Sequence, residues 1–360
     1  MLKQSSELNF EGHNIFVGID LHLKSWTVTI LTDKLSHKTF TQPASVDTLH
    51  SYLVNKFPGG VYHSVYEAGF SGLWTHYKLQ EMGINNIVVN PADVPTTQKE
   101  ELGKDDPVDS RKLARSLRSG DLTPIYIPAP STLEDRSLVR LRATIVKDMA
   151  RFKQRIKSFL YFYGISYPQE FEKAGTHWSK RFMKWLKEGV SLQHDSGNQS
   201  LKMLIQEAEQ QRKLLLETTR KVRELSCSEK YATNMLLLRT IPGVGFITAI
   251  TFLTEVENIE RFGNSDHFAG FIGLVPNQHS TGDKKRIGEM TFRGQDTLKR
   301  ALIESSWFAA RLDPALNKSF HTYLNRMEAN KAIIRIARKV LNRMYFVLKY
   351  KTEYVSSVVK

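Results

Sequence analysis

The sequence has almost no cysteine and no long apolar run, and both absences narrow the classes of protein to which it can belong. Cys227 is the only cysteine among 360 residues, so no disulfide can form within the chain. No apolar stretch approaches the roughly 18 residues that a membrane-spanning helix needs. The first residues, MLKQSSELNFEGHN, contain neither the apolar core nor the cleavage site of a secretory signal. We therefore expect a cytoplasmic protein without a membrane partner.

Acidic residues are scarce relative to basic ones in the later part of the chain. Residues 1–128 contain 12 Lys and Arg and 14 Asp and Glu, whereas residues 129–360 contain 39 and 23. This excess of basic residues predicts a polyanionic partner for the second part. A well-solvated basic surface without such a partner is the alternative that charge alone leaves open.

The order of the hydrophobic patterns predicts an α/β domain followed by helices. Apolar and β-branched runs predict strands within 14–32 and over 38–42, 62–69 and 85–91, and three other segments predict helices, namely 45–57, 72–82 and 106–120. Strands followed by alternating strands and helices are typical of an α/β or mixed sheet domain, which we assign to residues 1–128.

The pattern becomes helical beyond a proline-rich segment at 123–131. Apolar residues recur at a spacing of three to four over 138–164 and 201–226. This spacing predicts an antiparallel helical hairpin or coiled coil within residues 129–231. A mainly α-helical domain is expected over 232–360.

Four acids occupy unusual positions in the first domain. Asp20 interrupts an apolar strand, and Glu67 ends another. Asp106 and Asp109 lie three residues apart at a helix start, so they share one face. An unpaired carboxylate is costly to bury, and a cation would remove that cost. Because hard oxygen ligands suit Mg²⁺ and paired Mg²⁺ ions support phosphoryl transfer, the four acids predict a site for one or two Mg²⁺ ions.

Each of these acids also has an ordinary structural interpretation. Asp106 before Pro107 resembles a helix N-cap followed by proline at the first helical position, and Asp109 would then complete a capping box. Asp20 could form an ion pair with Lys24. Glu67 alone carries no information about function.

A glycine-containing turn marks the beginning of the last domain. The residues Pro242-Gly243-Val244-Gly245 stand between two apolar helical stretches and resemble a helix-hairpin-helix turn. Such a turn can present backbone N–H groups of Gly243 and Gly245 to a phosphate, without reading base sequence. An ordinary turn between packed helices is the alternative.

A polar, basic loop follows Pro276. It contains a single serine, Ser280, and three cations that could stabilise a phosphate, namely Lys284, Lys285 and Arg286. A loop of this kind can bring a hydroxyl group beside a backbone phosphate. Its composition alone is typical of a solvated surface loop.

Several short segments resemble one known family. GIDLH, YEAG and KDDPVDS resemble the D-E-D-D blocks of the DEDD-type insertion-sequence transposases, relatives of the Piv invertase often called the IS-one-ten group. IPGVG, GLVP, HSTG, IGEMTFRG and LKRALIESSW resemble, in the same order, the C-terminal transposase domain of that family. The likeness covers about 14–125 and 232–350. At the third block the family usually reads K-T-D-x-x-D-A, and here Asp105 and Ser110 replace the threonine and the alanine.

This resemblance implies a fold and an activity. It implies an RNase H-like, RuvC-like fold for residues 1–128 and an enzyme that cuts and rejoins DNA through a serine–phosphate intermediate. Ser280 matches the nucleophilic serine, and Thr281 is the neighbouring alternative. The metal-binding acids would cooperate with it, and Arg293 would join the nucleic-acid contacts. The resemblance also implies donor and target DNA, a non-coding guide RNA of the bridge type and a homo-oligomer of two or four chains.

Two other functions remain open at this point. A RuvC-like, metal-dependent, structure-specific nuclease would use metal-bound water, and Ser280 would be incidental. A covalent protein–DNA adduct separates this nuclease from the recombinase. A nucleic-acid-binding protein without catalysis would use the four acids as caps and surface charges. In that case divalent-metal binding would survive alanine at Asp20 and Glu67.

Overall fold

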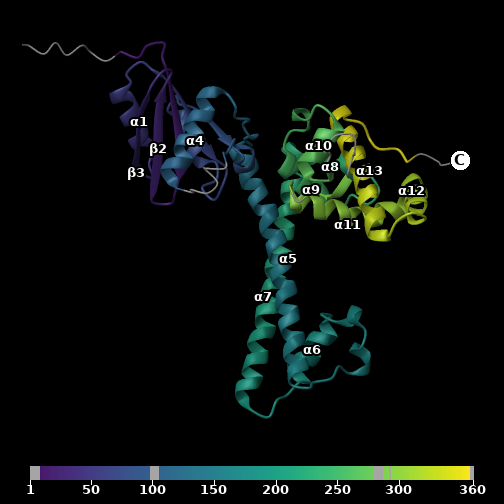
Figure 1. Ribbon diagram of the computed structural model, residues 1–360. Helices are drawn as coiled ribbons and strands as arrows, with labels where there is room; N and C mark the ends of the chain where they lie inside the picture. The colour runs from purple at the N-terminus through teal and green to yellow at the C-terminus, as the bar shows by residue number, and fades with distance from the viewer. Residues whose placement is uncertain (1–8, 98–104, 279–286, 292, 357–360) are drawn as a thin grey trace, which may run out of the picture. The chain divides into compact units, whose positions relative to one another are not determined.

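The computed structural model describes residues 9–97, 105–278, 287–291 and 293–356 (Figure 1). The chain divides into two compact units, residues 1–127 and 128–360. In the described part of the chain, none of the helices combines the length and the apolar character that crossing a bilayer requires.

The first unit is built on a five-stranded mixed sheet. Its strands are β1 (Asn14–Leu21), β2 (Ser25–Thr32), β3 (Ser36–Pro43), β4 (Val61–Glu67) and β5 (Asn85–Val89), in the spatial order β3-β2-β1-β4-β5. The first three strands form an antiparallel meander, whereas β4 lies parallel to β1 and β5 parallel to β4. The carboxyl ends of β1, β4 and β5 therefore meet at one edge of the sheet.

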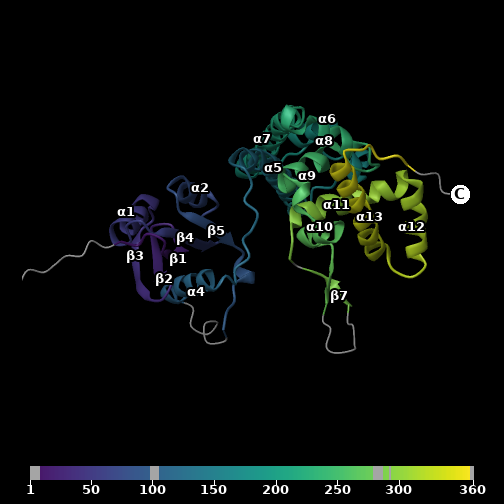
Figure 2. The same ribbon diagram turned by 90° about the horizontal axis from the view of Figure 1, so that it is seen from above.

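Helices cover both faces of this sheet. The helices α1 (Val46–Lys56) and α2 (Trp74–Glu81) lie on one face, and α4 (Asp106–Ser119) lies on the other (Figure 2). Alternate β1 residues face the α1 and α2 side, where Ile15, Val17 and Ile19 are fully buried with Leu49 and Leu79. A short 3-10 helix, η1 (Pro91–Asp93), follows β5. The strands β1 and β2 are thus mostly buried, whereas β3 at the edge of the sheet is mostly exposed.

Gly18 determines how closely α4 approaches the sheet. A Cβ on Gly18 would lie 2.1 Å from the Ser110 carbonyl oxygen and 2.4 Å from the Ala114 amide nitrogen, both in the α4 backbone. Real Cβ atoms do not approach backbone atoms this closely, so glycine is required here. The absence of a side chain lets the first turns of α4 lie directly against β1, next to Asp20.

The second unit begins with a long antiparallel helix pair. The helices α5 (Pro130–Phe162) and α7 (Asp195–Ser226) pack along each other (Figure 1). Arg142 Nε donates to Thr219 Oγ1 at 3.0 Å near one end, and Ile156 packs with Leu201 near the other. The segment between them contains the 3-10 turns η2 (Gln169–Phe171) and η3 (Ala174–Thr176) and the helix α6 (Lys180–Glu188). The chain therefore builds a second small core at the end of the hairpin.

The remainder of the second unit is a helical bundle. Its helices are α8 (Glu229–Arg239), α9 (Phe246–Val256), α10 (Ser265–Ile272), α11 (Asp296–Leu312), α12 (Pro314–Leu324) and α13 (Ala329–Tyr350), with the 3-10 turn η4 (Ile259–Arg261) and the strands β6 (Pro276–Gln278) and β7 (Ile287–Met290). The apolar face of α13 forms much of the core, where Ile336, Val340 and Met344 are fully buried.

A mixed α/β sheet unit followed by a helical region fits the RNase H-like class that the sequence predicts. A boundary between the hairpin and the last domain near residue 231 stays a prediction. The start of α5 and the end of α9 are joined by ion pairs, because Arg140 binds Glu255 with Nε to Oε1 at 2.7 Å. Helices from both sides of the predicted boundary thus pack within one compact unit.

Candidate active site

The sheet topology brings the first two predicted acids to the same place. Asp20 is the penultimate residue of β1, and Glu67 is the last residue of β4. Since the two strands are parallel neighbours, both carboxylates lie at the carboxyl edge of the sheet. Asp20 alternates with Ile19 and Leu21, which point into the α1 and α2 core, so it belongs to the α4 face.

The first turn of α4 brings Asp106 beside Asp20. One ligand atom from each of Asp20, His22 and Asp106 lies within 4.8 Å of the other two. His22 Nδ1 is 3.7 Å from Asp20 Oδ2 and 4.0 Å from Asp106 Oδ2. These three side chains form a compact group that a single cation could contact.

Asp109 and Glu67 are joined by a buried lysine. Lys112 Nζ is 3.2 Å from Asp109 Oδ1 and 3.8 Å from Glu67 Oε1. Lys112 is only 8% exposed, so its ammonium group and these carboxylates interact with little screening by water. Asp109 and Lys112 lie three residues apart on α4, and the helix therefore directs both toward the end of β4.

The pKa of Asp20 shows that the four acids influence one another. The pKa of Asp20 is raised from 3.8 to about 6, chiefly by burial and also by the carboxylates of Asp106, Asp109 and Glu67, whereas His22 lowers it. The interaction with His22 therefore does not offset the cost of placing ionised Asp20 at this position. A divalent cation bound by the carboxylates would remove that cost.

The beginning of α4 differs from the capping interpretation of the sequence. Asp105, not Asp106, is the N-cap residue, and its side chain makes no capping hydrogen bond. Asp106 and Asp109 are thus the first and fourth helical residues, and the predicted capping box is wrong. Both acids lie in the first turn, where the partial positive charge of the helix favours anionic side chains.

The serine that replaces the usual family alanine has a structural partner. Ser110 is fully buried, and its Oγ is 2.9 Å from Thr29 Oγ1 on β2. Its hydroxyl group also reaches the Pro107 carbonyl oxygen at 3.3 Å. Thr29 contacts Thr39 at 2.8 Å, so a short hydroxyl chain fastens α4 to the sheet. The hydroxyl group that distinguishes Ser110 from the usual alanine therefore has hydrogen-bond partners inside the protein.

Sequence reasoning missed two residues of this site. His22 stands two residues after Asp20, and its place in GIDLH gave a positional signal, because residues two apart at a strand end share a face. Lys112 stands three residues after Asp109, which is a helical neighbour position. Its burial against two acids could not be inferred without knowing how α4 docks on the sheet.

The predicted nucleophile and cations fall mostly outside the described residues. Ser280, Thr281, Lys284, Lys285 and Arg286 all belong to the part of the chain that is not described. Arg293 is described and exposed, just before α11. Its backbone amide donates to Thr291 Oγ1 at 3.1 Å. The geometry of the serine loop stays a prediction.

The two glycines of the predicted phosphate-binding turn have different surroundings. A Cβ on Gly243, whose φ is +86°, would lie 2.5 Å from the Ser305 carbonyl oxygen of α11. Gly243 is thus required for packing of the turn on α11. A Cβ on Gly245, the N-cap residue of α9, would meet nothing within 4 Å. Open space at a helix N-terminus is compatible with the predicted phosphate contact at Gly245.

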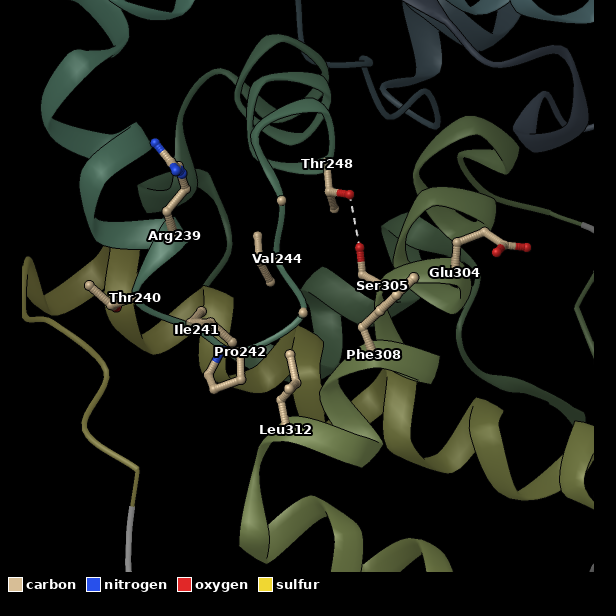
Figure 3. A pocket seen from close by; sticks show the side chains of 12 residues that line it. Arg239, Thr240, Ile241, Pro242, Val244, Thr248, Glu304, Ser305, Phe308 and Leu312 are labelled. Carbon is tan, nitrogen blue, oxygen red and sulfur yellow. Dashed lines mark hydrogen bonds between the residues drawn. The ribbon is translucent and has the colours of Figure 1, made fainter. Parts of the chain in front are cut away.

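This turn lines a hollow of about 490 Å³ together with α11 (Figure 3). Thr248 Oγ1 and Ser305 Oγ form a hydrogen bond of 2.8 Å across it. Phe308 and Leu312, which are 59% and 64% exposed, form its apolar side, and Arg239 and Glu304 contribute opposite charges. The hollow is therefore lined by both apolar and charged side chains. Binding of nucleic acid by the turn remains a prediction.

Two family models match separate parts of the chain. A transposase model of the DEDD type of IS110 elements matches residues 17–165, which include all four acids of the site. A second model, described as the transposase IS116/IS110/IS902 family, matches residues 235–321, from α8 into α12.

Curated relatives agree with both matches. The chain is 31% identical to the putative transposase y4qE of Sinorhizobium fredii over 281 residues, which are 78% of this chain and 66% of that protein, slightly under two thirds. It is 25% identical to the putative transposase y4rJ of the same organism over 91% of this chain and 90% of the relative. The transposase for insertion sequence element IS1111A of Coxiella burnetii is 25% identical over 72% of this chain and 70% of that protein.

Proposed function

Since this chain belongs to the DEDD-type insertion-sequence transposases of the IS110 family, we propose that it cuts and rejoins DNA at the ends of such an element. The observation that carries the proposal is the convergence of Asp20, Asp106, Asp109 and Glu67 at the carboxyl edge of the sheet. Burial of Asp20 at this edge and, to a smaller extent, the three neighbouring carboxylates raise its pKa.

The residues present fit a divalent metal ion, and we assign them to Mg²⁺. Asp20 and Asp106 offer carboxylate oxygens within 4.8 Å of each other, and Asp109 and Glu67 extend the donor set. All four are hard oxygen donors, which Mg²⁺ prefers. When bound, Mg²⁺ would polarise a DNA phosphate and favour the ionised form of an attacking hydroxyl group.

The chain's own residues would then orient the reacting groups. Lys112 would orient Asp109, to which it donates a hydrogen bond, and attract Glu67, and His22 lies beside Asp20 and Asp106. In the proposed step, Ser280 Oγ forms a bond to phosphorus while one phosphorus–oxygen bond of the DNA strand breaks. The serine proton leaves to a base, and the released strand end takes up a proton as a hydroxyl group.

The proposal includes three kinds of partner. Donor and target DNA would be held mainly by the basic second part of the chain, with Gly245, Arg293 and the cations of the serine loop near the phosphates. A non-coding guide RNA of the bridge type would select the target. Because strand exchange joins two duplexes, the working form would be a homo-oligomer of two or four chains.

A trapped covalent adduct tests the proposal. The full-length protein is incubated with Mg²⁺ and a nicked DNA substrate that carries the element end, together with RNA that copurifies with the protein. We expect a protein–DNA adduct that survives denaturation, and its loss in the Ser280→Ala variant with DNA binding retained. Loss of the adduct in Thr281→Ala but not in Ser280→Ala would move the nucleophile to Thr281.

The same experiment separates the recombinase from a metal-dependent nuclease. A nuclease would cut DNA without an adduct, and Ser280→Ala would still cut at the parental rate. That result would overturn the serine mechanism while leaving the metal site intact.

A further inference from the structure

The end of the α5–α7 hairpin carries a group of aromatic rings that the protein leaves in solvent. Tyr161 is 88% exposed, Phe162 79% and Tyr163 49%, and all three stand where α5 ends. Phe162 and Tyr163 pack edge to face with ring centroids 5.1 Å apart, and Tyr163 also packs on Phe159 at 4.8 Å. We call residues 147–208 the hairpin tip.

The hairpin tip already has a complete core of its own. Its buried residues come from α5, η2, α6 and α7, namely Ile156, Leu160, Phe171, Phe182, Leu186, Leu201, Ile205 and Ala208. Aromatic residues of the same segment, such as Tyr167 and Trp185, pack against that core. Tyr161 and Phe162 take no part in it, so packing within the described chain does not account for them.

The surroundings of these rings are basic. Residues 147–208 contain eleven Lys and Arg and six Asp and Glu. Exposed cations stand on α5 at Arg151 and Arg155 and at the start of α6 at Lys180 and Arg181. A second copy of the same basic surface would be repelled, whereas a polyanion would be attracted.

A groove runs beside the exposed rings. It encloses about 1010 Å³ and is lined by Tyr161, Phe162 and Tyr167, by the cation Lys157 and by the acid Glu172. Flat rings beside a groove with flanking cations are the combination that binds unpaired bases: the rings stack on bases and the cations contact phosphates.

We infer that the hairpin tip is a binding site for single-stranded nucleic acid, in which Tyr161 and Phe162 stack on unpaired bases. The rings lie at the C-terminal end of α5, about 20 residues beyond Arg140, which contacts the helical bundle. The residues of this site are different from the four acids of the first unit, Asp20, Glu67, Asp106 and Asp109, which we call the acid cluster. The inference rests on the proposed function in expecting a nucleic-acid partner, but it needs no cutting of DNA.

Strand binding by the full-length protein tests the inference. Fluorescence anisotropy is measured with labelled oligothymidylate, oligouridylate and an abasic strand that has the phosphates but no bases. We expect the double variant Tyr161→Ala/Phe162→Ala to bind the base-containing strands about 10-fold more weakly or worse, because each stacked base contributes substantially to affinity. Binding of the abasic strand should not change. The oligothymidylate and oligouridylate arms show whether DNA or RNA is preferred.

Matched variants keep the result interpretable. The exchange Tyr161→Phe/Phe162→Tyr keeps both rings and should bind as the parent does. Phe346→Ala/Tyr350→Ala removes two exposed, stacked rings on α13 and should also leave strand binding unchanged. Lys157→Gln should reduce the slope of log affinity against log salt, by roughly 0.7 for one lost phosphate contact, whereas the alanine double variant should not.

Three outcomes would overturn the inference. One is unchanged binding of the base-containing strands by the alanine double variant, and another is an equal loss on the abasic strand. The third is a change of oligomeric state in sedimentation with strand affinity intact, which would assign the rings to contact between protein chains. A protein that binds strands as inferred and yet fails to cut DNA would refute the proposed function and leave this inference standing.

Discussion

The buried Glu255 of the helical unit and the partly exposed acids of the sheet unit have opposite electrostatic surroundings. In the helical unit, Glu255 is 4% exposed and is bound by Arg140 through two hydrogen bonds of 2.7 and 2.8 Å, with Arg136 Nε at 3.4 Å. In the sheet unit, Asp20 stands among other carboxylates, and its pKa is raised to about 6. The carboxylate of Glu255, which stabilises the fold, is thus paired with guanidinium groups. The acids of the sheet unit repel one another, and a bound cation would remove this repulsion.

The largest expected effect concerns activity. Replacing Asp20 with Ala should lower the rate of DNA cutting and rejoining by at least about 1000-fold, because a preorganised metal ligand contributes several kcal/mol to the transition state. Nucleic-acid affinity should stay within a few-fold, since the basic residues are untouched. The exposed Glu81, replaced by Gln, is the control and should keep parental activity. Parental activity in Asp20→Ala would remove the acid cluster from the mechanism.

The second prediction concerns Glu255, whose replacement should lower the stability of the helical unit. Glu255→Gln removes the anionic partner of Arg136 and Arg140, and we expect a cost of about 1–3 kcal/mol, because Arg136 is largely buried whereas the Arg140 side chain is 53% exposed and screened by water. Thermal unfolding followed by calorimetry should show a lower Tm for the helical unit at neutral pH. A change of less than about 0.5 kcal/mol would mean that this cluster does not stabilise the fold.

Replacing an acid of the acid cluster should have the opposite effect on stability from Glu255→Gln. The pKa of Asp20 is higher in the folded protein than its ordinary value of 3.8, so ionisation destabilises the fold as pH rises through about 6. Asp20→Asn should therefore stabilise the metal-free protein at about pH 8 by roughly 1–3 kcal/mol, and the gain should vanish near pH 4. Urea unfolding in chelator at both pH values measures this difference. A destabilised Asn variant at pH 8 would contradict the comparison.

The smallest expected effect concerns the hydrogen bond between Ser110 of α4 and Thr29 of the sheet. Ser110→Ala restores the residue usual in the family but leaves Thr29 Oγ1 without its partner on the helix. We expect a loss of about 1 kcal/mol, the usual net value of a hydrogen bond, from urea unfolding. Ser110→Ala combined with Thr29→Val should recover part of the loss, because both polar groups are then removed.

Much of this site was readable from the sequence, since strand ends and helix starts have local signals. The strand ending at Glu67 and the helix beginning at Asp106 follow from apolar runs and from Pro107. The capping prediction failed because a one-residue shift of the helix start changes which aspartate is the N-cap. Lys112 and the contact between Ser110 and Thr29 depend on the close docking of α4 over Gly18, and such long-range packing has no local signature.

Mg²⁺ binding to the parent protein, measured by isothermal titration calorimetry at about pH 8, tests the central claim most directly. The account predicts saturable binding by the parent and by Glu81→Gln, and its loss in both Asp20→Asn and Asp106→Asn, because these two acids supply the closest pair of carboxylates. Mg²⁺ affinity that is the same in the parent and in both Asn variants would contradict the account.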